Sequence, residues 1–132
     1  MTKASTTLDH PVKLSTKWVP KLNALSDGSG VSDCQVSGSA ACLQAMTADL
    51  NALTALLKDI DAADARAEYP KSIAQINKMV RASDAYDTDG CGGDPNADVD
   101  GSPCSGNAMA VTIGVATLSF ILPTDELNAG VS

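Results

Sequence analysis

The first apolar pattern in the chain recurs at helical spacing between residues 13 and 30. Apolar side chains return at every third or fourth position, which places them on one face of a helix. Pro20 falls inside this pattern, where a proline removes a backbone hydrogen bond and clashes with the preceding turn. We therefore expect a helix that begins near Ser15 or Thr16, or that is kinked at Pro20, and that ends in the Gly- and Ser-rich residues 26–30. The apolar positions are Leu14, Trp18, Leu22 and Leu25.

The second apolar pattern is the most regular in the chain. Six large apolar residues alternate by three and four positions over almost three heptads, which predicts a long amphipathic helix. Ser37 or Ser39 is suited to cap its start, because a serine hydroxyl accepts a hydrogen bond from a free backbone N–H group. Pro70 ends this helix and can be the first residue of the next. The six residues are Leu43, Met46, Leu50, Leu53, Leu57 and Ile60.

The third pattern begins at Pro70 and predicts a helix that ends at Gly90. Its apolar face is flanked on either side by Met79 and Tyr86. Because no long connection separates this helix from the preceding one, the two should form an antiparallel αα-hairpin. The residues of the predicted face are Ile73, Ile76, Val80 and Ser83.

The last apolar segment, residues 108–122, is compatible with more than one structure. No charged residue occurs from 105 to 124, and β-branched residues are frequent, which favours a strand. Helical spacing is also satisfied twice, and a helix that is apolar on all sides is a buried helix. Fifteen residues are fewer than the roughly 20 that a membrane span needs. We expect a buried helix, with a β-hairpin and a membrane segment as alternatives. The two helical rows are Met109, Ile113, Ala116 and Phe120, and Val111, Val115, Leu118 and Leu122.

These patterns together predict an all-α fold, a four-helix bundle in which three amphipathic helices are closed by a more apolar one. The alternative is an α+β fold with the last segment as a β-hairpin. The chain has 132 residues, which is enough for one core, so we expect a flexible polar leader at 1–10 and a single helical domain at 11–132. Twenty alanines and only four aromatic residues favour closely packed helices.

Four cysteines form two pairs that are each local in sequence. This spacing predicts the disulfides Cys34–Cys42 and Cys91–Cys104, although four cysteines allow three connectivities. Disulfides indicate an oxidising compartment, so we expect a secreted protein. The chain starts without an apolar signal segment, and we expect it to be a mature form; a cytosolic protein with free thiols is the alternative.

Charge is spread unevenly along the chain. The net charge is −7, and six aspartates without any Lys or Arg lie between residues 84 and 100. A nucleic-acid partner would require a basic patch, which the sequence lacks, and the same lack argues against an anionic membrane as a partner.

Two Asp-x-Asp-Gly units in this acidic segment supply candidate calcium ligands. Ca²⁺ takes six to eight oxygen ligands, and a glycine turn after alternating aspartates aims several carboxylates inward. Neither unit fits an EF-hand loop, because the closing Glu is missing in both registers. The alternative is a connector, rich in turn-forming residues and closed by the Cys91–Cys104 bridge. The candidate ligands are Asp87, Asp89, Asp98 and Asp100.

No catalytic or cofactor-binding motif is found in the sequence. The single histidine, His10, falls in the polar leader, and no cluster with metal-ligand spacing accompanies it. Asp59, Asp61 and Asp64 are expected to form a solvated acidic helix face. We therefore expect a small secreted helical-bundle protein that binds a protein or a small ligand. The alternatives are an extracellular calcium-binding module and a membrane-active or self-assembling protein that acts through residues 108–122.

Overall fold

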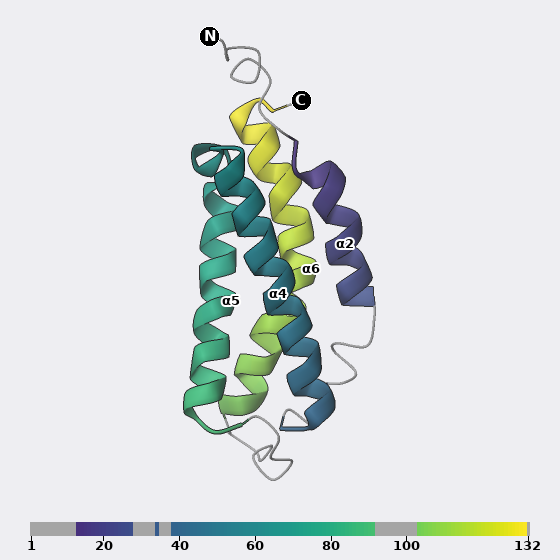
Figure 1. Ribbon diagram of the computed structural model, residues 1–132, viewed down its shortest axis with the longest axis vertical. Helices are drawn as coiled ribbons and strands as arrows, with labels where there is room; N and C mark the ends of the chain where they lie inside the picture. The colour runs from purple at the N-terminus through teal and green to yellow at the C-terminus, as the bar shows by residue number, and fades with distance from the viewer. Residues whose placement is uncertain (1–12, 28–33, 35–37, 92–102, 132) are drawn as a thin grey trace.

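The computed structural model describes residues 13–27, 34, 38–91 and 103–131. Within these residues, four α-helices lie side by side along the long axis of the molecule, and a 3-10 turn, η1 (Arg66–Glu68), connects the second to the third (Figure 1). The helices are α2 (Ser15–Asp27), α4 (Ala40–Ala62), α5 (Pro70–Thr88) and α6 (Pro103–Ala129). The predicted all-α bundle is confirmed, and the β-hairpin alternative is wrong, because residues 108–122 lie within α6.

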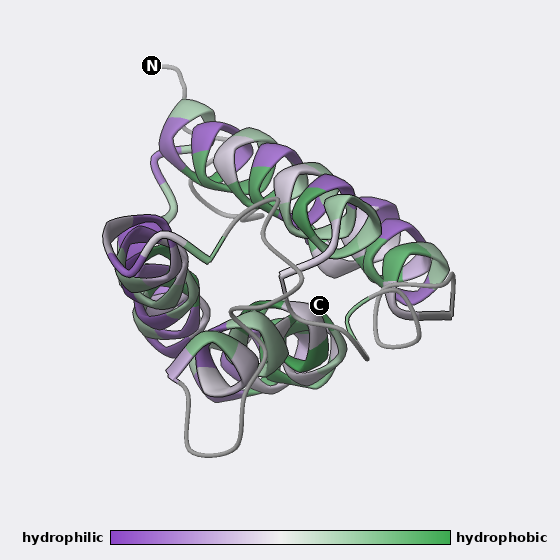
Figure 2. Cartoon of the chain, turned by 90° about the horizontal axis from the view of Figure 1, so that it is seen from below, coloured by the Kyte–Doolittle hydropathy of each residue, from purple (hydrophilic) through white to green (hydrophobic). Residues whose placement is uncertain are grey.

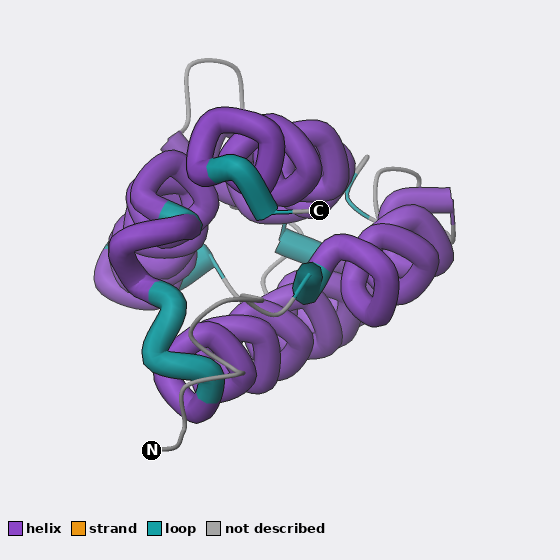
Figure 3. The backbone as a smooth tube through the Cα atoms, turned by 90° about the horizontal axis from the view of Figure 1, so that it is seen from above, coloured by secondary structure: helices purple, strands orange, loops and turns teal. Residues whose placement is uncertain are grey.

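Helix α6 is the central element of the bundle. It contacts each of the other three helices, and α2 covers it along the upper part of its length (Figure 1). Seen end-on, the helices surround a common interior (Figure 2), and the described segments are helices joined by loops (Figure 3). The predicted αα-hairpin is also present, since α4 and α5 run antiparallel on either side of η1.

The interior is divided into two clusters. One cluster draws residues from all four helices, including Trp18, Leu53, Met79 and Leu118. The other gathers the four cysteines with Met46, Tyr86, Ala108 and Val111. The disulfides thus form part of the core rather than a surface staple. Both predicted pairs are confirmed, with Cα–Cα distances of 4.4 Å for Cys34–Cys42 and 5.7 Å for Cys91–Cys104.

The buried face of α4 is rotated relative to the predicted one. Leu43 is exposed, and Leu50 and Leu57 are half-buried. Cys42, which is bonded to Cys34, lies on this buried face. The buried residues are Cys42, Met46, Asp49, Leu53, Leu56 and Ile60.

The helix boundaries largely follow the expected signals. Ser39 is the N-cap of α4, and its hydroxyl accepts a hydrogen bond of 3.1 Å from the backbone N–H of Cys42. Pro70 begins α5, and Gly90 follows its end with a φ of 70°, a conformation that glycine adopts at little cost. Helix α2 begins at Ser15 and contains Pro20 within its length.

Helix α6 extends beyond the apolar segment 108–122. It passes through Pro123 and continues to Ala129. Asp125 and Glu126 are both buried in this final part, and their contacts with α5 and α2 hold the extra turns in place.

Two helices, α4 and α6, are long and apolar enough to cross a membrane by length and composition. In the structure both contribute to the bundle core, and this test is also passed by core helices.

Candidate functional site

The predicted calcium ligands fall only partly within the described residues. Asp87 lies in the last turn of α5, Asp89 is the residue that caps the helix, and both are exposed. Asp98 and Asp100 lie outside the described residues. Across 13–27, 34, 38–91 and 103–131, no group of three or more His, Cys, Asp or Glu side chains is placed to hold a metal ion. Calcium binding stays a prediction.

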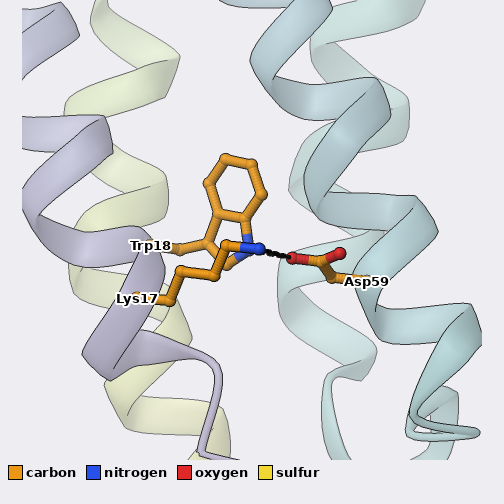
Figure 4. A network of polar contacts seen from close by, with 3 residues as sticks. All are labelled: Lys17, Trp18 and Asp59. Atoms are coloured by element: carbon orange, nitrogen blue, oxygen red, sulfur yellow. Dashed lines mark hydrogen bonds and ion pairs between the residues drawn. The ribbon is translucent and has the colours of Figure 1, made fainter.

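The acidic residues of α4 have separate structural partners. Asp59 accepts hydrogen bonds of 2.8 Å from Lys17 Nζ and from Trp18 Nε1, which join α2 to α4 (Figure 4). The hydrogen bond from Lys17, followed by that from Trp18, lowers the pKa of Asp59. The Nζ atoms of Lys17 and Lys21 lie 5.5 Å and 5.4 Å from the centre of the Trp18 ring, within cation–π range.

Of the other two acids, Asp61 lies in the last turn of α4 and Asp64 lies in the turn after it. Asp61 forms an ion pair with Arg66, which lowers the pKa of the Asp61 carboxyl group. Asp64 has a φ of 51° in the same turn. Asp59 therefore joins α2 to α4, Asp61 joins the end of α4 to η1, and the three aspartates do not converge on a site.

A pair of buried carboxylates near the end of α6 was missed by the sequence analysis. Asp125 is 2% exposed and accepts hydrogen bonds from the first turn of α5: 2.7 Å from Ser72 N, 2.8 Å from Ser72 Oγ and 3.4 Å from Lys71 N. The N-cap residue of α5 is Tyr69, whose own side chain does not cap the first turn of the helix. Asp125 supplies that cap from another helix, and its negative charge suits the positive end of the α5 dipole.

Glu126 performs the same role for α2. Its Oε2 accepts a hydrogen bond of 2.8 Å from the backbone N–H of Ser15 and one of 2.6 Å from the Tyr69 hydroxyl, and its Oε1 accepts a hydrogen bond from Ser15 Oγ. The Tyr69 hydroxyl in turn accepts a hydrogen bond of 3.0 Å from the backbone N–H of Leu14. Burial, together with the hydrogen bond to Glu126, raises the pKa of Tyr69.

The carboxylates of Asp125 and Glu126 have the character of structural groups. Each accepts hydrogen bonds from residues at or next to the start of another helix, so its oxygens hold helices together. The sequence signal for them was two adjacent acids after an apolar helix and a proline. That pattern does not predict whether the two acids are buried or exposed, because their burial depends on which elements pack against them.

A third buried carboxyl group, Asp49, has a different environment. It is 4% exposed, and no hydrogen bond from the described residues reaches it. Burial raises the pKa of Asp49 from 3.8 to about 7. On α4 it lies between the residues of the two core clusters, as Ser83 does on α5 and Thr112 does on α6. These three buried polar residues mark the boundary between the two halves of the core.

The outer face of α6 carries the largest exposed apolar side chains of the described residues. Phe120 is 75% exposed, Leu127 is 80% exposed and Ile113 is 45% exposed. Met109, Ala116 and Pro123 are half-buried along the same line. We call Met109, Ile113, Ala116, Phe120, Pro123 and Leu127 the outer row. Its first four members form one of the two helical rows found in the sequence. The expectation that α6 is buried on all sides is wrong, because no described helix covers this face.

A groove runs beside the outer row, between α6 and α5. It has a volume of about 290 Å³, and Gln75 and Lys78 of α5 line it opposite Ile113 and Thr117 of α6. The two helices approach closely here because Gly114 has no side chain. A Cβ atom at this position would lie 2.8 Å from Cγ and Sδ of Met79. The edge of the outer row is therefore hollowed by the groove, and Lys78 places one positive charge there.

Comparisons with protein-family models, with curated proteins and with solved structures return no match to this chain.

Proposed function

We propose that this chain is a secreted, disulfide-bonded binding protein and that the outer row of α6 is its binding surface. The exposure of Phe120 carries the proposal. An aromatic ring that is three-quarters exposed stands beside the exposed Ile113 and Leu127 on one face, and such apolar patches mark interaction surfaces in soluble proteins. Burying a side chain of this size contributes about 1.5–3 kcal/mol to association.

Two further observations support this function. The two disulfides fit an extracellular protein, for which a preformed and rigid surface lowers the entropy lost on binding. The buried acids Asp125 and Glu126 fasten α6 to the starts of α5 and α2, so the helix that bears the outer row is anchored to its neighbours.

The proposal is tested by comparing three forms of the immobilised, disulfide-intact protein: wild type, Phe120→Glu and Val80→Glu. Val80 is an apolar residue of α5 that is 40% exposed and lies outside the outer row, so it serves as the matched control. We expect wild type and Val80→Glu to retain the same component of the native extracellular medium, identified by mass spectrometry. Phe120→Glu should retain it at least tenfold less, as for an interface hot spot. Equal retention by all three forms would refute the outer row as the binding surface.

A further inference from the structure

The outer row has the spacing of a coiled-coil seam. Its six members are separated by four, three, four, three and four positions, which assigns Ile113, Phe120 and Leu127 to heptad position a. Met109, Ala116 and Pro123 then occupy position d. No charged residue lies on the row itself, and Lys78, which lines the groove beside it, has a long side chain that can keep its charge in solvent when the row is covered.

We propose that a second copy of this chain occupies the outer row, with the two α6 helices packed antiparallel about a two-fold axis near residue 118. This inference rests on the proposed function of the outer row as a binding surface. In antiparallel pairs, position a of one helix faces position d of the other, and this register pairs every member of the row. Met109 faces Leu127, Ile113 faces Pro123, and Ala116 faces Phe120.

The sizes of the paired residues favour this orientation. Phe120, the largest side chain of the row, is placed over Ala116, the smallest, so that a ridge on one copy fills a gap on the other. A parallel pair would instead place Phe120 against Phe120 and Ala116 against Ala116. That arrangement combines a steric clash with a void.

The polar residues beside the row tolerate burial. The hydroxyl of Thr124 donates a hydrogen bond of 2.9 Å to the carbonyl of Phe120, and the hydroxyl of Thr117 donates one of 3.4 Å to the carbonyl of Ile113. Because both donors are satisfied within α6, covering them leaves no unpaired hydroxyl hydrogen.

The size of the surface sets the expected strength of the dimer. From Met109 to Leu127 the row extends about 27 Å at 1.5 Å per residue. With the adjoining α5 edge it is roughly 20 Å wide, so pairing buries on the order of 1,000 Å² in total, near the lower limit for a specific interface. We therefore infer a reversible dimer that forms as the protein concentration rises.

Sedimentation equilibrium of the full, disulfide-intact chain tests the dimer. Over a wide concentration range, wild type and Val80→Glu should move from monomer to dimer with the same dissociation constant. Phe120→Glu should raise that constant at least tenfold, while its helical circular dichroism stays unchanged. A wild-type chain that remains monomeric throughout would overturn the proposal. So would an equal loss of dimer in Val80→Glu and Phe120→Glu.

Disulfide cross-linking tests the orientation with two matched variants, Thr117→Cys and Thr124→Cys. Both positions are exposed, flank the row and lie one heptad apart. In the proposed register the two copies of position 117 are offset along the axis by about 3 Å and those of position 124 by about 18 Å. Oxidation should therefore yield covalent dimers for Thr117→Cys and none for Thr124→Cys. Equal cross-linking of both variants would refute the antiparallel pairing.

A photoreactive phenylalanine analogue in place of Phe120 separates the two proposals. Labelling of position 116 in a second copy supports self-pairing. Labelling of a different extracellular molecule, with no label on a second copy, overturns self-pairing and leaves the outer row as a binding surface. No labelling of any molecule in the native medium would overturn both.

Discussion

At the scale of single residues, the described part of the chain buries three carboxyl groups, which differ in what surrounds them. Asp125 and Glu126 accept hydrogen bonds from the starts of α5 and α2, while Asp49 lies between two apolar clusters. A carboxylate that is buried with donors contributes to stability, whereas one that is buried without them destabilises the folded state when it is charged. The same residue type therefore has opposite effects at different sites.

Asp49 should make the protein less stable as the pH rises from about 4 to about 7. Its pKa is about 7 in the folded chain against 3.8 when it is exposed, so over this interval the folded state keeps a proton that the unfolded state has lost. This contribution is fully present below pH 3.8 and is lost as the pH rises through 7, at up to roughly 1.4 kcal/mol per pH unit. Asp49→Asn should remove this dependence and be more stable than wild type at pH 8, as measured by urea unfolding at several pH values.

Glu126→Gln is the matched control for Asp49→Asn, because it also neutralises a buried carboxylate. It should destabilise the protein by roughly 1.5–3 kcal/mol at pH 8, since charge-assisted hydrogen bonds from Ser15 and Tyr69 are weakened. If both substitutions lowered stability at pH 8 to the same extent, the distinction between the two carboxylates would be wrong.

At the scale of secondary-structure elements, α6 combines two faces of different purpose. The row of Val111, Val115, Leu118 and Leu122 lies in the core, and the outer row faces solvent. On the side of α6 that meets α5, Gly114 allows Met79 to approach the helix backbone. The helix is thus apolar on nearly all sides because one face packs in the core and the other is the outer row. Sequence composition alone does not distinguish these two faces.

Gly114→Leu should destabilise the bundle by about 1–3 kcal/mol, because the new side chain overlaps Met79 and Gln75 and pushes α5 away from α6. The same substitution at Gly106, where an added Cβ meets no atom within 4 Å, is the control. Gly106→Leu should leave stability unchanged or raise it by about 0.5–1 kcal/mol, since leucine is a better helix former than glycine. Urea unfolding measures both, and equal effects would argue against close packing at Gly114.

At the scale of the whole molecule, the two disulfides close the end of the bundle that α2 does not cover. All four cysteines are buried in one cluster, and the bridges span 8 and 13 positions of the sequence. Short loops of this kind restrict the unfolded chain, which stabilises the folded state by comparison. The disulfides therefore complement the larger apolar cluster shared by the four helices.

Removing either bridge by a double substitution to alanine should lower the free energy of unfolding by about 2.5–3 kcal/mol. Cys34→Ala with Cys42→Ala, and Cys91→Ala with Cys104→Ala, each remove one bridge and leave no unpaired thiol. Non-reducing peptide mapping of wild type should recover only the 34–42 and 91–104 linkages. Free thiols or a 34–91 linkage in the native protein would contradict the pairing.

The sequence by itself was enough to favour the all-α class, most helix boundaries and both disulfides over their alternatives. Those features depend on local rules: the spacing of apolar residues, the capping by Ser39, the prolines and glycine at helix ends, and the short separation within each cysteine pair. It also identified two apolar rows on the last helix, because spacing along a helix is a property of sequence.

Only the tertiary structure decided which of those rows faces the core and which acids are buried. Phe120 and Leu118 are equally apolar in sequence, but α6 turns Leu118 toward its neighbours and leaves Phe120 exposed. Asp125 and Glu126 become helix caps because the starts of α5 and α2 are brought beside them from positions more than 50 residues away. Such contacts join distant parts of the chain, and periodicity along one helix carries no information about the partner it meets.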